Sequence, residues 1–400
     1  MEEKYLFLFG NTPQLGLKEL ESFFTNCKVS VENLERFSLY VLAKTSVIDY
    51  QTVLNQLGCT IKIALVLGDD YDAAQLEAAI FQELKKGQQK VVFGTSSPDK
   101  SLSQQSLRVL KVEIKRKLSL TKKGIRFIDS PDERGLSSVV IAKEKVSEFL
   151  IFKPDNKFLL AKTIAVQNYE YWSKADFGRP FADPRSGMLP PKIARAMVNL
   201  SQECPCNTKE SRTLLDPFCG MGTILQEGLA DGFAVIGSDF SSEVIKKTQK
   251  NLEWYTKEFK PVKNFSLFTV DAVHLSQLPL SEIDCIVTEG YMGPTLEIYQ
   301  EEVFTSGRTE KLNTEKLKNI YKGLEKLYIG SLREWKKVLK KDGKVVMIFP
   351  SFHLPKFTLK PEKIIDKIRN LGYSISYGPL EYSRFGASII RNIYLLNNLS

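Results

Sequence analysis

The sequence has few histidines and cysteines, and their scarcity argues against several kinds of site. Only His274 and His353 occur in 400 residues, which disfavours a Ser-His or Cys-His mechanism. Six cysteines are too few for a disulfide scaffold. Cys204 and Cys206 form an isolated Cys-Pro-Cys, whereas a structural zinc requires four ligands. We therefore expect a reduced loop there and no metal.

Long apolar runs are also missing. No run approaches the roughly 20 residues that cross a bilayer, and the chain starts with Glu2 and Glu3 where a secretory signal peptide has basic residues. The apolar fraction of 43% and the charged fraction of 26% are typical of globular proteins. A length of 400 residues is enough for two or three domains. These features predict a cytoplasmic protein.

The formal net charge of +9 is unevenly distributed. Residues 84–126 hold twelve Lys and Arg residues against Asp99 and Glu113, a net charge of +10. Such a concentration is typical of proteins that bind a phosphate backbone, although a solvated lysine-rich helix face gives the same pattern. The candidate RNA contacts in this segment are Lys111, Lys115, Arg116, Lys122, Lys123 and Arg126.

The pattern of the first 165 residues predicts two small α+β modules. In the first module we expect strands at residues 5–10, 28–31, 38–45 and 61–67 and helices at 15–24 and 49–57. This βαββαβ order is ferredoxin-like. In the second module we expect strands at residues 91–94, 125–129, 137–142, 148–153 and 159–166 and a basic amphipathic helix at 103–118.

Strands and helices alternate after the Pro/Gly-rich segment at 178–191. We expect helices at 192–200 and 314–341 and strands at 213–218, 234–240, 265–272, 283–289, 344–350, 373–377 and 392–396. Alternation with short apolar strands predicts a Rossmann-like α/β fold, a parallel sheet with helices on both faces. The last two strands have no helix between them, which predicts an antiparallel hairpin at one edge.

The segment DPFCGMGT, which begins at Asp216, is a candidate ligand loop. Gly220 and Gly222 permit a tight turn at a helix N-terminus, where the backbone can approach a ligand. The loop lacks the third glycine of a dinucleotide fingerprint and the GK[ST] of a P-loop. Asp216, Asp239 and Asp271 end the first three strands, at the edge where open α/β sheets bind ligands. Each aspartate alone could be a helix N-cap, but the three together favour an adenosine-type cofactor.

These motifs carry a family resemblance. The segment LLDPFCGMGTILQEG (214–228) resembles the first motif of class I methyltransferases that act on exocyclic amines of nucleic-acid bases. With GRPFADPRSGMLPPKIARAMVNLS (178–201), it resembles the archaeal and eukaryotic tRNA guanosine-N2 methyltransferases that carry an N-terminal THUMP domain. LGCTIKIA (57–64) and LSSVVI (136–141) are similar to N-terminal segments of that family.

The resemblance covers essentially the whole chain and implies three domains. These are a ferredoxin-like domain at residues 1–80, a THUMP RNA-binding domain at 81–167, and a class I methyltransferase domain with a seven-stranded, mostly parallel sheet at 168–400. It implies methyl transfer from S-adenosyl-L-methionine to N2 of a guanosine in tRNA, usually at position 10. Action as a monomer and action with a small activating subunit both fit the resemblance.

The resemblance also implies the cofactor contacts. The glycine loop would face the methionine part, Asp239 the ribose, and Asp271 with Ala272 the adenine, while residues 188–191 close over the cofactor. The full set of implied contacts is Met188, Pro190, Asp216, Phe218, Cys219, Gly220, Gly222, Thr223, Asp239, Phe240, Asp271, Ala272 and Glu289.

The catalytic loop departs from the family pattern. In the family, the fourth strand ends in an acid or amide followed by Pro-Pro and an aromatic, so that the guanine amine finds proton acceptors and the base a stacking partner. This sequence has Glu-Gly-Tyr-Met-Gly-Pro from Glu289 onward. One alignment places Thr288 at the acid position and keeps Tyr291 as the stacking aromatic; the other makes Glu289 the acceptor. We expect Glu289 and Tyr291 to be the catalytic pair.

Other readings remain open. Arg384 and Arg391, near the C-terminus, are either phosphate contacts or ordinary surface arginines. An rRNA or DNA amino-methyltransferase would share the cofactor motif. The altered loop is also what a non-catalytic protein that binds RNA and the cofactor would show, with Glu289 and Tyr291 only shaping the loop.

Overall fold

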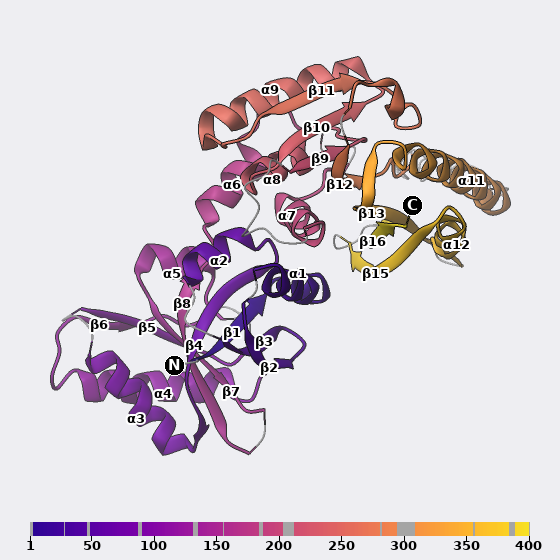
Figure 1. The fold of residues 1–400 in the computed structure, drawn as a ribbon. Helices are drawn as coiled ribbons and strands as arrows, with labels where there is room; N and C mark the ends of the chain where they lie inside the picture. Colours follow the sequence, from indigo (N-terminus) through magenta and orange to yellow (C-terminus); the bar gives the residue numbers. More distant parts are fainter. Residues whose placement is uncertain are drawn as a thin grey trace. The chain divides into compact units, whose positions relative to one another are not determined.

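The computed structural model describes residues 3–27, 29–45, 49–86, 90–130, 135–154, 156–183, 187–202, 212–280, 282–293, 309–354, 357–383 and 389–399. Arg384, Cys204 and Cys206 lie outside these residues. The chain divides into two compact units (Figure 1). Unit 1 comprises Met1–Leu20 and Lys28–Tyr171, and unit 2 comprises Glu21–Cys27 and Trp172–Ser400.

Unit 1 is built on one eight-stranded sheet in the order β2-β3-β1-β4-β8-β7-β5-β6. The strands are β1 (Glu3–Phe9), β2 (Val31–Arg36), β3 (Tyr40–Thr45), β4 (Thr60–Tyr71), β5 (Val91–Ser96), β6 (Ile125–Phe127), β7 (Ser147–Phe152) and β8 (Phe158–Val166). The helices are α1 (Pro13–Asn26), α2 (Tyr50–Gln56), α3 (Ala73–Lys85), α4 (Gln104–Leu118), α5 (Ser138–Glu144) and α6 (Tyr169–Phe177), of which α1 and α6 each lie partly in unit 2.

The two modules expected in residues 1–165 share this sheet. Strand β4 of the first pairs antiparallel with β8 of the second. Residue 80, the expected end of the first domain, lies inside α3. The sequence pattern missed α3 although its start carries a capping box, in which Asp72 accepts from the Gln75 backbone and Gln75 from the Asp72 backbone.

One expected strand is a helix. Residues 137–142 were expected to form a strand, but α5 spans Ser138–Glu144. The Ser137 side chain caps it by accepting a hydrogen bond from the Val140 amide. The local cap outweighs the β propensity of Val139, Val140 and Ile141, and only Ile141 of the helix is buried. The strand expected at 28–31 is instead β2, at Val31–Arg36.

The core of unit 1 has two sides, set by the alternation of side chains along β7. Phe149 and Ile151 pack with the apolar faces of α3 and α4, whereas Leu150 and Phe152 pack with β1 and β3. The rings of Phe152 and Tyr40 are 4.3 Å apart although three strands separate β7 from β3 in the sheet order. The sheet is therefore strongly curled.

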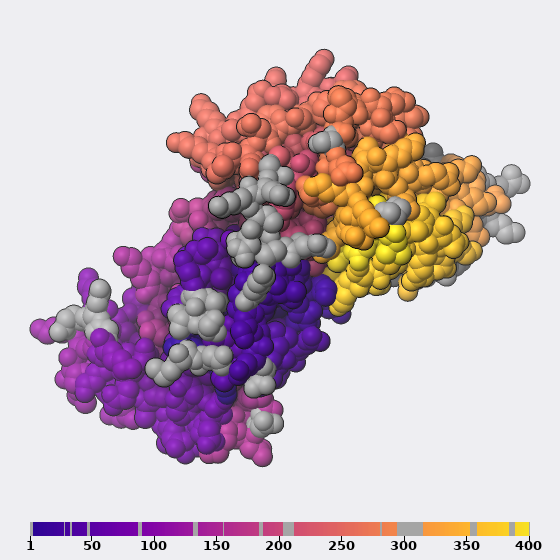
Figure 2. Space-filling view, viewed as in Figure 1, coloured from indigo at the N-terminus to yellow at the C-terminus, as the bar shows by residue number. Residues whose placement is uncertain are grey.

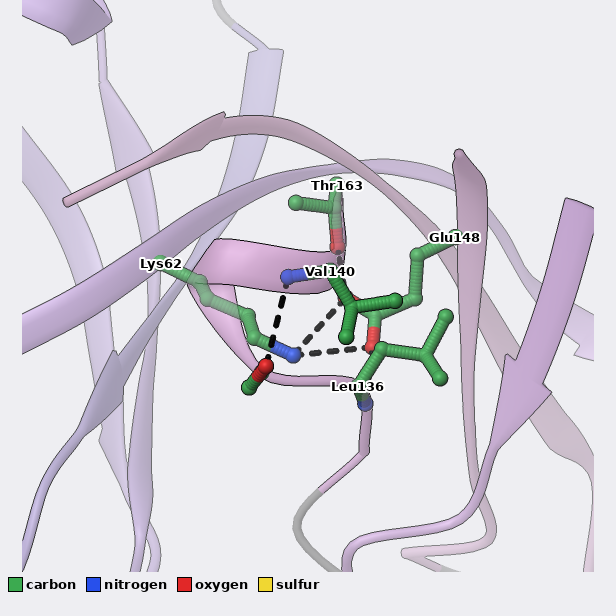
Figure 3. A network of polar contacts seen from close by, with 6 residues as sticks. Lys62, Leu136, Val140, Glu148 and Thr163 are labelled. Carbon is green, nitrogen blue, oxygen red and sulfur yellow. Dashed lines mark hydrogen bonds and ion pairs between the residues drawn. The ribbon is translucent and has the colours of Figure 1, made fainter. Parts of the chain in front are cut away.

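A buried ion pair joins the middle strands of unit 1 (Figure 3). The Lys62 ammonium on β4 donates to both carboxylate oxygens of Glu148 on β7, at 2.8 and 2.9 Å. Glu148 also accepts from Thr163 on β8 and from the Leu136 amide. The Lys62 and Glu148 side chains are 1% and 0% exposed. These hydrogen bonds give a buried charge pair the partners it needs.

Unit 2 contains a mostly parallel sheet in the order β11-β10-β9-β12-β13-β16-β15, with β14 paired to β13. Its strands are β9 (Thr213–Asp216), β10 (Ala234–Asp239), β11 (Phe265–Thr269), β12 (Ile283–Glu289), β13 (Leu339–Leu354), β14 (Phe357–Leu359), β15 (Tyr373–Tyr382) and β16 (Ile389–Asn398). The helices are α7 (Pro191–Leu200), α8 (Thr223–Ala230), α9 (Ser242–Phe259), the short 3-10 helix η2 (Leu275–Gln277), α11 (Thr309–Trp335) and α12 (Glu362–Asn370).

The expected parallel sheet with an antiparallel edge hairpin is confirmed. Strands β9 to β13 are parallel, and β15 and β16 are antiparallel to each other, with β16 antiparallel to β13. Figure 2 shows the yellow C-terminal surface beside orange surface, in keeping with the pairing of β16 with β13. Helix α11 ends at Trp335, six residues before the expected end, because Leu339 already pairs with Ile283 as strand.

Helices cover both faces of this sheet. Leu214 and Val235 lie against Gly228 of α8, whereas Leu215, the next residue along β9, belongs to the cluster formed with α11 and α12. Successive residues of β9 are therefore buried under different helices. The strand order reverses between β9 and β12, and open α/β sheets bind ligands beyond the carboxyl ends of strands at such a point.

Candidate functional site

The glycine loop, residues 216–223, connects β9 to α8. Gly220 has φ 47° and Gly222 φ 85°, a left-handed conformation that favours glycine. The Gly222 amide donates to the Cys219 carbonyl at 2.8 Å. A side chain at Gly222 would begin 3.0 Å from Thr248 Cγ2 of α9. The loop is thus a tight turn pressed against α9.

A single side chain of α9 joins the glycine loop to the Pro/Gly-rich segment. Asn251 donates to the carbonyls of Met221 and Phe181, at 2.9 and 3.0 Å, and accepts from the Phe181 amide at 2.9 Å. Arg179 adds a second link by donating to the Thr223 hydroxyl at 2.7 Å. The sequence reasoning missed Asn251 and Arg179, because such residues have no local signal in a helix or loop.

These elements enclose a cavity of about 710 Å³, a typical size for a small-molecule site. Eleven of the thirteen expected cofactor contacts line it: Met188, Asp216, Phe218, Cys219, Gly220, Thr223, Asp239, Phe240, Asp271, Ala272 and Glu289. Pro190 and Gly222 do not. Pro190 is the N-cap residue of α7 and Gly222 that of α8, so they shape the adjoining backbone. Residues that were not expected include Asp183 and Leu327.

Asp216 is the buried carboxylate of the cavity. It is 1% exposed and accepts hydrogen bonds from the Thr288 hydroxyl at 2.6 Å and from the Phe218 amide at 3.2 Å. Burial raises the pKa of Asp216 to about 7, although both hydrogen bonds act in the opposite direction. This carboxyl therefore changes charge near neutral pH.

Asp239 and Asp271 lie at the ends of the next two strands. Asp239 accepts from the Ser241 amide at 3.0 Å and from the Gly220 amide at 3.3 Å, and burial raises its pKa. Asp271 accepts from the Val273 amide at 3.1 Å. The Ala272 carbonyl is held by the Trp335 indole at 3.1 Å. The three carboxylates expected at the strand ends are therefore gathered on one cavity.

The residues named by the two alignments of the catalytic loop, called the acceptor loop below (residues 288–293), differ in their surroundings. Thr288 is fully buried and its hydroxyl donates to Asp216. Glu289 has an 18% exposed side chain and Tyr291 is 53% exposed, and both line the cavity. Glu289 and Tyr291 are therefore accessible from the cavity, whereas Thr288 is not among the residues that line it.

Arg391 occupies a different place from the surface position expected for a phosphate contact. It is 7% exposed, and its Nε donates to Glu289 Oε1 at 2.5 Å. A second guanidinium nitrogen donates to the Gly187 carbonyl. Arg391 is therefore an internal partner of the Glu289 carboxylate and does not occupy the surface position expected of a phosphate contact.

One cation of the basic segment in unit 1 is also internal. Lys111 is 1% exposed and pairs with Asp129 at 2.6 Å, because it lies on the inner face of α4, so its expected RNA contact is wrong. The other expected contacts are reachable from solvent: Lys115, Arg116, Lys122, Lys123 and Arg126. Arg116 pairs with Glu113 and Arg126 with Glu144 on the surface.

Two sequence-based exclusions can be compared with the structure. Within the described ranges, no group of three or more His, Cys, Asp and Glu side chains is arranged to hold a metal ion. None of the described helices combines the length and apolar character that a membrane crossing needs.

Comparisons with known proteins agree with this geometry. Residues 179–293 match the RMKL-like methyltransferase domain family. A protein of Methanothermobacter thermautotrophicus named tRNA (guanine(10)-N2)-dimethyltransferase is 33% identical over 172 residues, which are 42% of this chain and 45% of that protein. The match thus spans less than half of that relative.

Solved structures resemble the whole chain in fold. One, described as a possible methylase from Clostridium difficile 630, has a TM-score of 0.52 at 13% identity and covers 98% of both chains. Another, SMU.472 complexed with SAH, has a TM-score of 0.50 at 11% identity and covers 98% of this chain and 97% of that one. Residues 179–293 are therefore similar to the RMKL-like methyltransferase domain family, and the second unit has the class I methyltransferase fold.

Proposed function

We propose that the protein transfers a methyl group from S-adenosyl-L-methionine to N2 of a guanosine in tRNA, at position 10. The observation that carries the proposal is the shared cavity of the glycine loop, the strand-end carboxylates Asp216, Asp239 and Asp271, and the acceptor loop at Glu289. The name of the relative from Methanothermobacter thermautotrophicus supports the choice of base and RNA.

The cavity fits the cofactor. Each Asp239 oxygen accepts one backbone amide and keeps a lone pair that a ribose hydroxyl can use. The left-handed turn at Gly220 and Gly222 lets the backbone approach the methionine part. SMU.472, which shares the fold, was solved with SAH. When bound, the cofactor supplies a methyl group on a positively charged sulfonium.

The acceptor side would act on the guanine amine. Its lone pair is delocalised into the ring, so the amine attacks well only when a neighbouring group accepts its proton. The Glu289 carboxylate lines the cavity, where it would accept this proton. The exposed Tyr291 ring also lines the cavity and would stack on an extruded base. Both residues would act by holding the amine in a near-attack geometry.

Unit 1 would bind the RNA. We propose that it comprises the ferredoxin-like and THUMP modules at residues 1–80 and 81–167, and that the exposed cations of 84–126, such as Lys115 and Lys123, contact tRNA phosphates. Cytoplasmic location and action with or without a small activating subunit stay predictions.

The test is a transfer assay with labelled S-adenosyl-L-methionine and unmodified tRNA, followed by digestion to nucleosides. The proposal expects the label in N2-methylated guanosine from position 10. Label on adenosine or cytidine, or transfer to rRNA or DNA in preference to tRNA, would reject the guanosine and tRNA assignments.

Two observations favour a second candidate, an RNA-binding and cofactor-binding protein without turnover. Arg391 already pairs with the carboxylate that would accept the amine proton, and the prolines of the family loop are absent. Calorimetry with S-adenosyl-L-methionine, combined with the transfer assay, separates the two candidate functions. Binding of the cofactor without transfer to any tRNA, rRNA or DNA would select this candidate.

A further inference from the structure

The acceptor loop has a glycine where the resembled family has its first proline, and the structure shows why. An added Cβ at Gly290 would lie 2.8 Å from Cε1 of Tyr328 and 2.9 Å from Cε of Met347. Distances below 3.0 Å are closer than carbon atoms pack. The Tyr328 ring of α11 thus fills the space that a prolyl ring would need, and the stiffness of the loop must come from elsewhere.

Tyr328 also holds the loop backbone. Its hydroxyl donates to the Tyr291 carbonyl at 2.5 Å, and its ring packs edge-on against Phe349 at 5.4 Å. The side chain is 0% exposed, and burial raises the pKa of Tyr328 well above its usual value, which keeps the hydroxyl a donor. The loop backbone is therefore anchored to α11 immediately after Gly290.

Arg391 holds the other end of the loop. It lies on β16 opposite Pro350 of β13 and Tyr382 of β15, and it reaches across β13 to Glu289 at the end of β12. Its second hydrogen bond goes to the Gly187 carbonyl, next to Met188 of the cavity lining. One guanidinium thus fixes the acceptor carboxylate and the segment that closes the cofactor side.

We propose that Tyr328 and Arg391 are positioning residues that replace the missing prolines, by clamping Glu289 and Tyr291 in their catalytic arrangement. The catalytic part of this inference rests on the proposed methyl transfer, whereas the clamp itself is a property of the loop. A misplacement of about 1 Å at a reacting group costs about 100-fold in rate. We therefore expect loss of either clamp to lower kcat by between about 10-fold and about 100-fold.

The clamp can be tested without any activity, by hydrogen–deuterium exchange of the full chain followed at residues 289–293. Tyr328→Phe and Arg391→Gln should accelerate exchange in this segment. The matched controls are Tyr321→Phe, which removes another α11 hydroxyl that bonds a carbonyl, and Arg369→Gln, which breaks a surface ion pair. Both controls should leave the segment unchanged. Wild-type exchange in both folded clamp variants would overturn the inference.

The catalytic role is tested by comparing kcat with cofactor affinity. In Tyr328→Phe, kcat should fall at least about 10-fold while SAH affinity by calorimetry stays within about twofold. In Arg391→Gln, which also removes the hydrogen bond to the Gly187 carbonyl, kcat should fall by a larger factor than SAH affinity. Arg391→Lys keeps the charge but cannot hold Glu289 and Gly187 in the same geometry, so it should recover only part of kcat. This variant replaces Arg391→Gln if the glutamine variant does not fold. Faster exchange with unchanged kcat would overturn the positioning role.

The proposed methyl transfer and the clamp on the loop can be rejected separately. If wild-type protein transfers no methyl group to any tRNA, the proposed function and the catalytic purpose of the clamp fall together. The exchange experiment would still decide whether Tyr328 and Arg391 hold the loop.

Discussion

Thr288 donates a hydrogen bond to Asp216, with 2.6 Å between its Oγ1 and the carboxylate Oδ1. The two residues lie at the ends of the neighbouring parallel strands β12 and β9, where the strand order reverses. The bond joins the base of the acceptor loop to the glycine loop. It also gives the most buried carboxylate of the cavity a fixed partner, and this has consequences for stability.

The stability of the ligand-free protein should depend on the ionisation of Asp216. Its pKa is about 7 in the fold against an ordinary value of 3.8, so the folded state binds more protons than the unfolded state between these values. Stability from this group is present at low pH and is lost as the pH rises from about 4 to about 7, by an amount of about 4 kcal/mol. Urea unfolding between pH 4.5 and 7.5 should show this fall.

Asp216→Asn provides the comparison, since asparagine does not ionise. The free energy of unfolding of the variant should fall less across the same pH range than that of the wild type. Parallel pH profiles for the two proteins would show that Asp216 titrates at its ordinary pKa.

Asp239→Asn should weaken cofactor binding while leaving the fold intact. An amide offers one acceptor oxygen where the carboxylate offers two, and hydrogen bonds to a charged acceptor contribute about 1.5–3 kcal/mol. SAH affinity by calorimetry should fall by between about 10-fold and about 100-fold. Glu243→Gln, a nearby surface change at the start of α9, is the control. Equal affinities in wild type and Asp239→Asn would remove Asp239 from the site.

Breaking the buried pair of unit 1 should destabilise the protein strongly. Lys62→Met leaves the Glu148 carboxylate buried without its cation, which costs about 3–5 kcal/mol in comparable cases. Lys117→Met removes a half-exposed partner of Glu77 and should cost less than about 1 kcal/mol. Denaturant unfolding measures both. Similar losses in the two variants would mean that burial of the Lys62–Glu148 pair has no special effect.

The exposed cations of unit 1 should govern RNA affinity through salt. In Lys115→Glu and Lys123→Glu, tRNA binding should weaken, and the slope of log affinity against log salt should become shallower by about one for each cation. Lys257→Glu on α9 of unit 2 is the charge-matched control. The experiment is a filter-binding titration at several salt concentrations. An equal loss in the control would assign the effect to total charge and not to unit 1.

Local patterns in the sequence predicted the parts of the site that are contiguous. The turn at Gly220 and Gly222 and the strand-end carboxylates depend on residues near one another in the chain, and the alternation of strands and helices determines where they meet. The short apolar runs of β9 and β12 identified these strands for the same reason.

The partners of the acceptor loop could not be predicted in this way. Arg391 lies 102 residues from Glu289, and no spacing or periodicity connects them. Lys111 shares its helix with solvent-exposed cations, and only the packing of α4 on the sheet places it inside. In α5 the cap at Ser137 decided the structure against the β-branched run that follows it. In each case the structure depends either on a tertiary contact or on a helix cap that outweighs the local secondary-structure propensity.

The most direct test of the account compares wild type with Glu289→Gln in methyl transfer to unmodified tRNA. Glutamine keeps the size of the side chain but removes the carboxylate that would accept the amine proton, an effect of about 100-fold or more on kcat. Glu282→Gln, at an exposed position just before β12, should transfer at the wild-type rate. The account predicts N2-methylguanosine from the wild type and about 100-fold less from Glu289→Gln, a loss much larger than any change in SAH affinity. Equal rates of transfer in wild type and Glu289→Gln would contradict it.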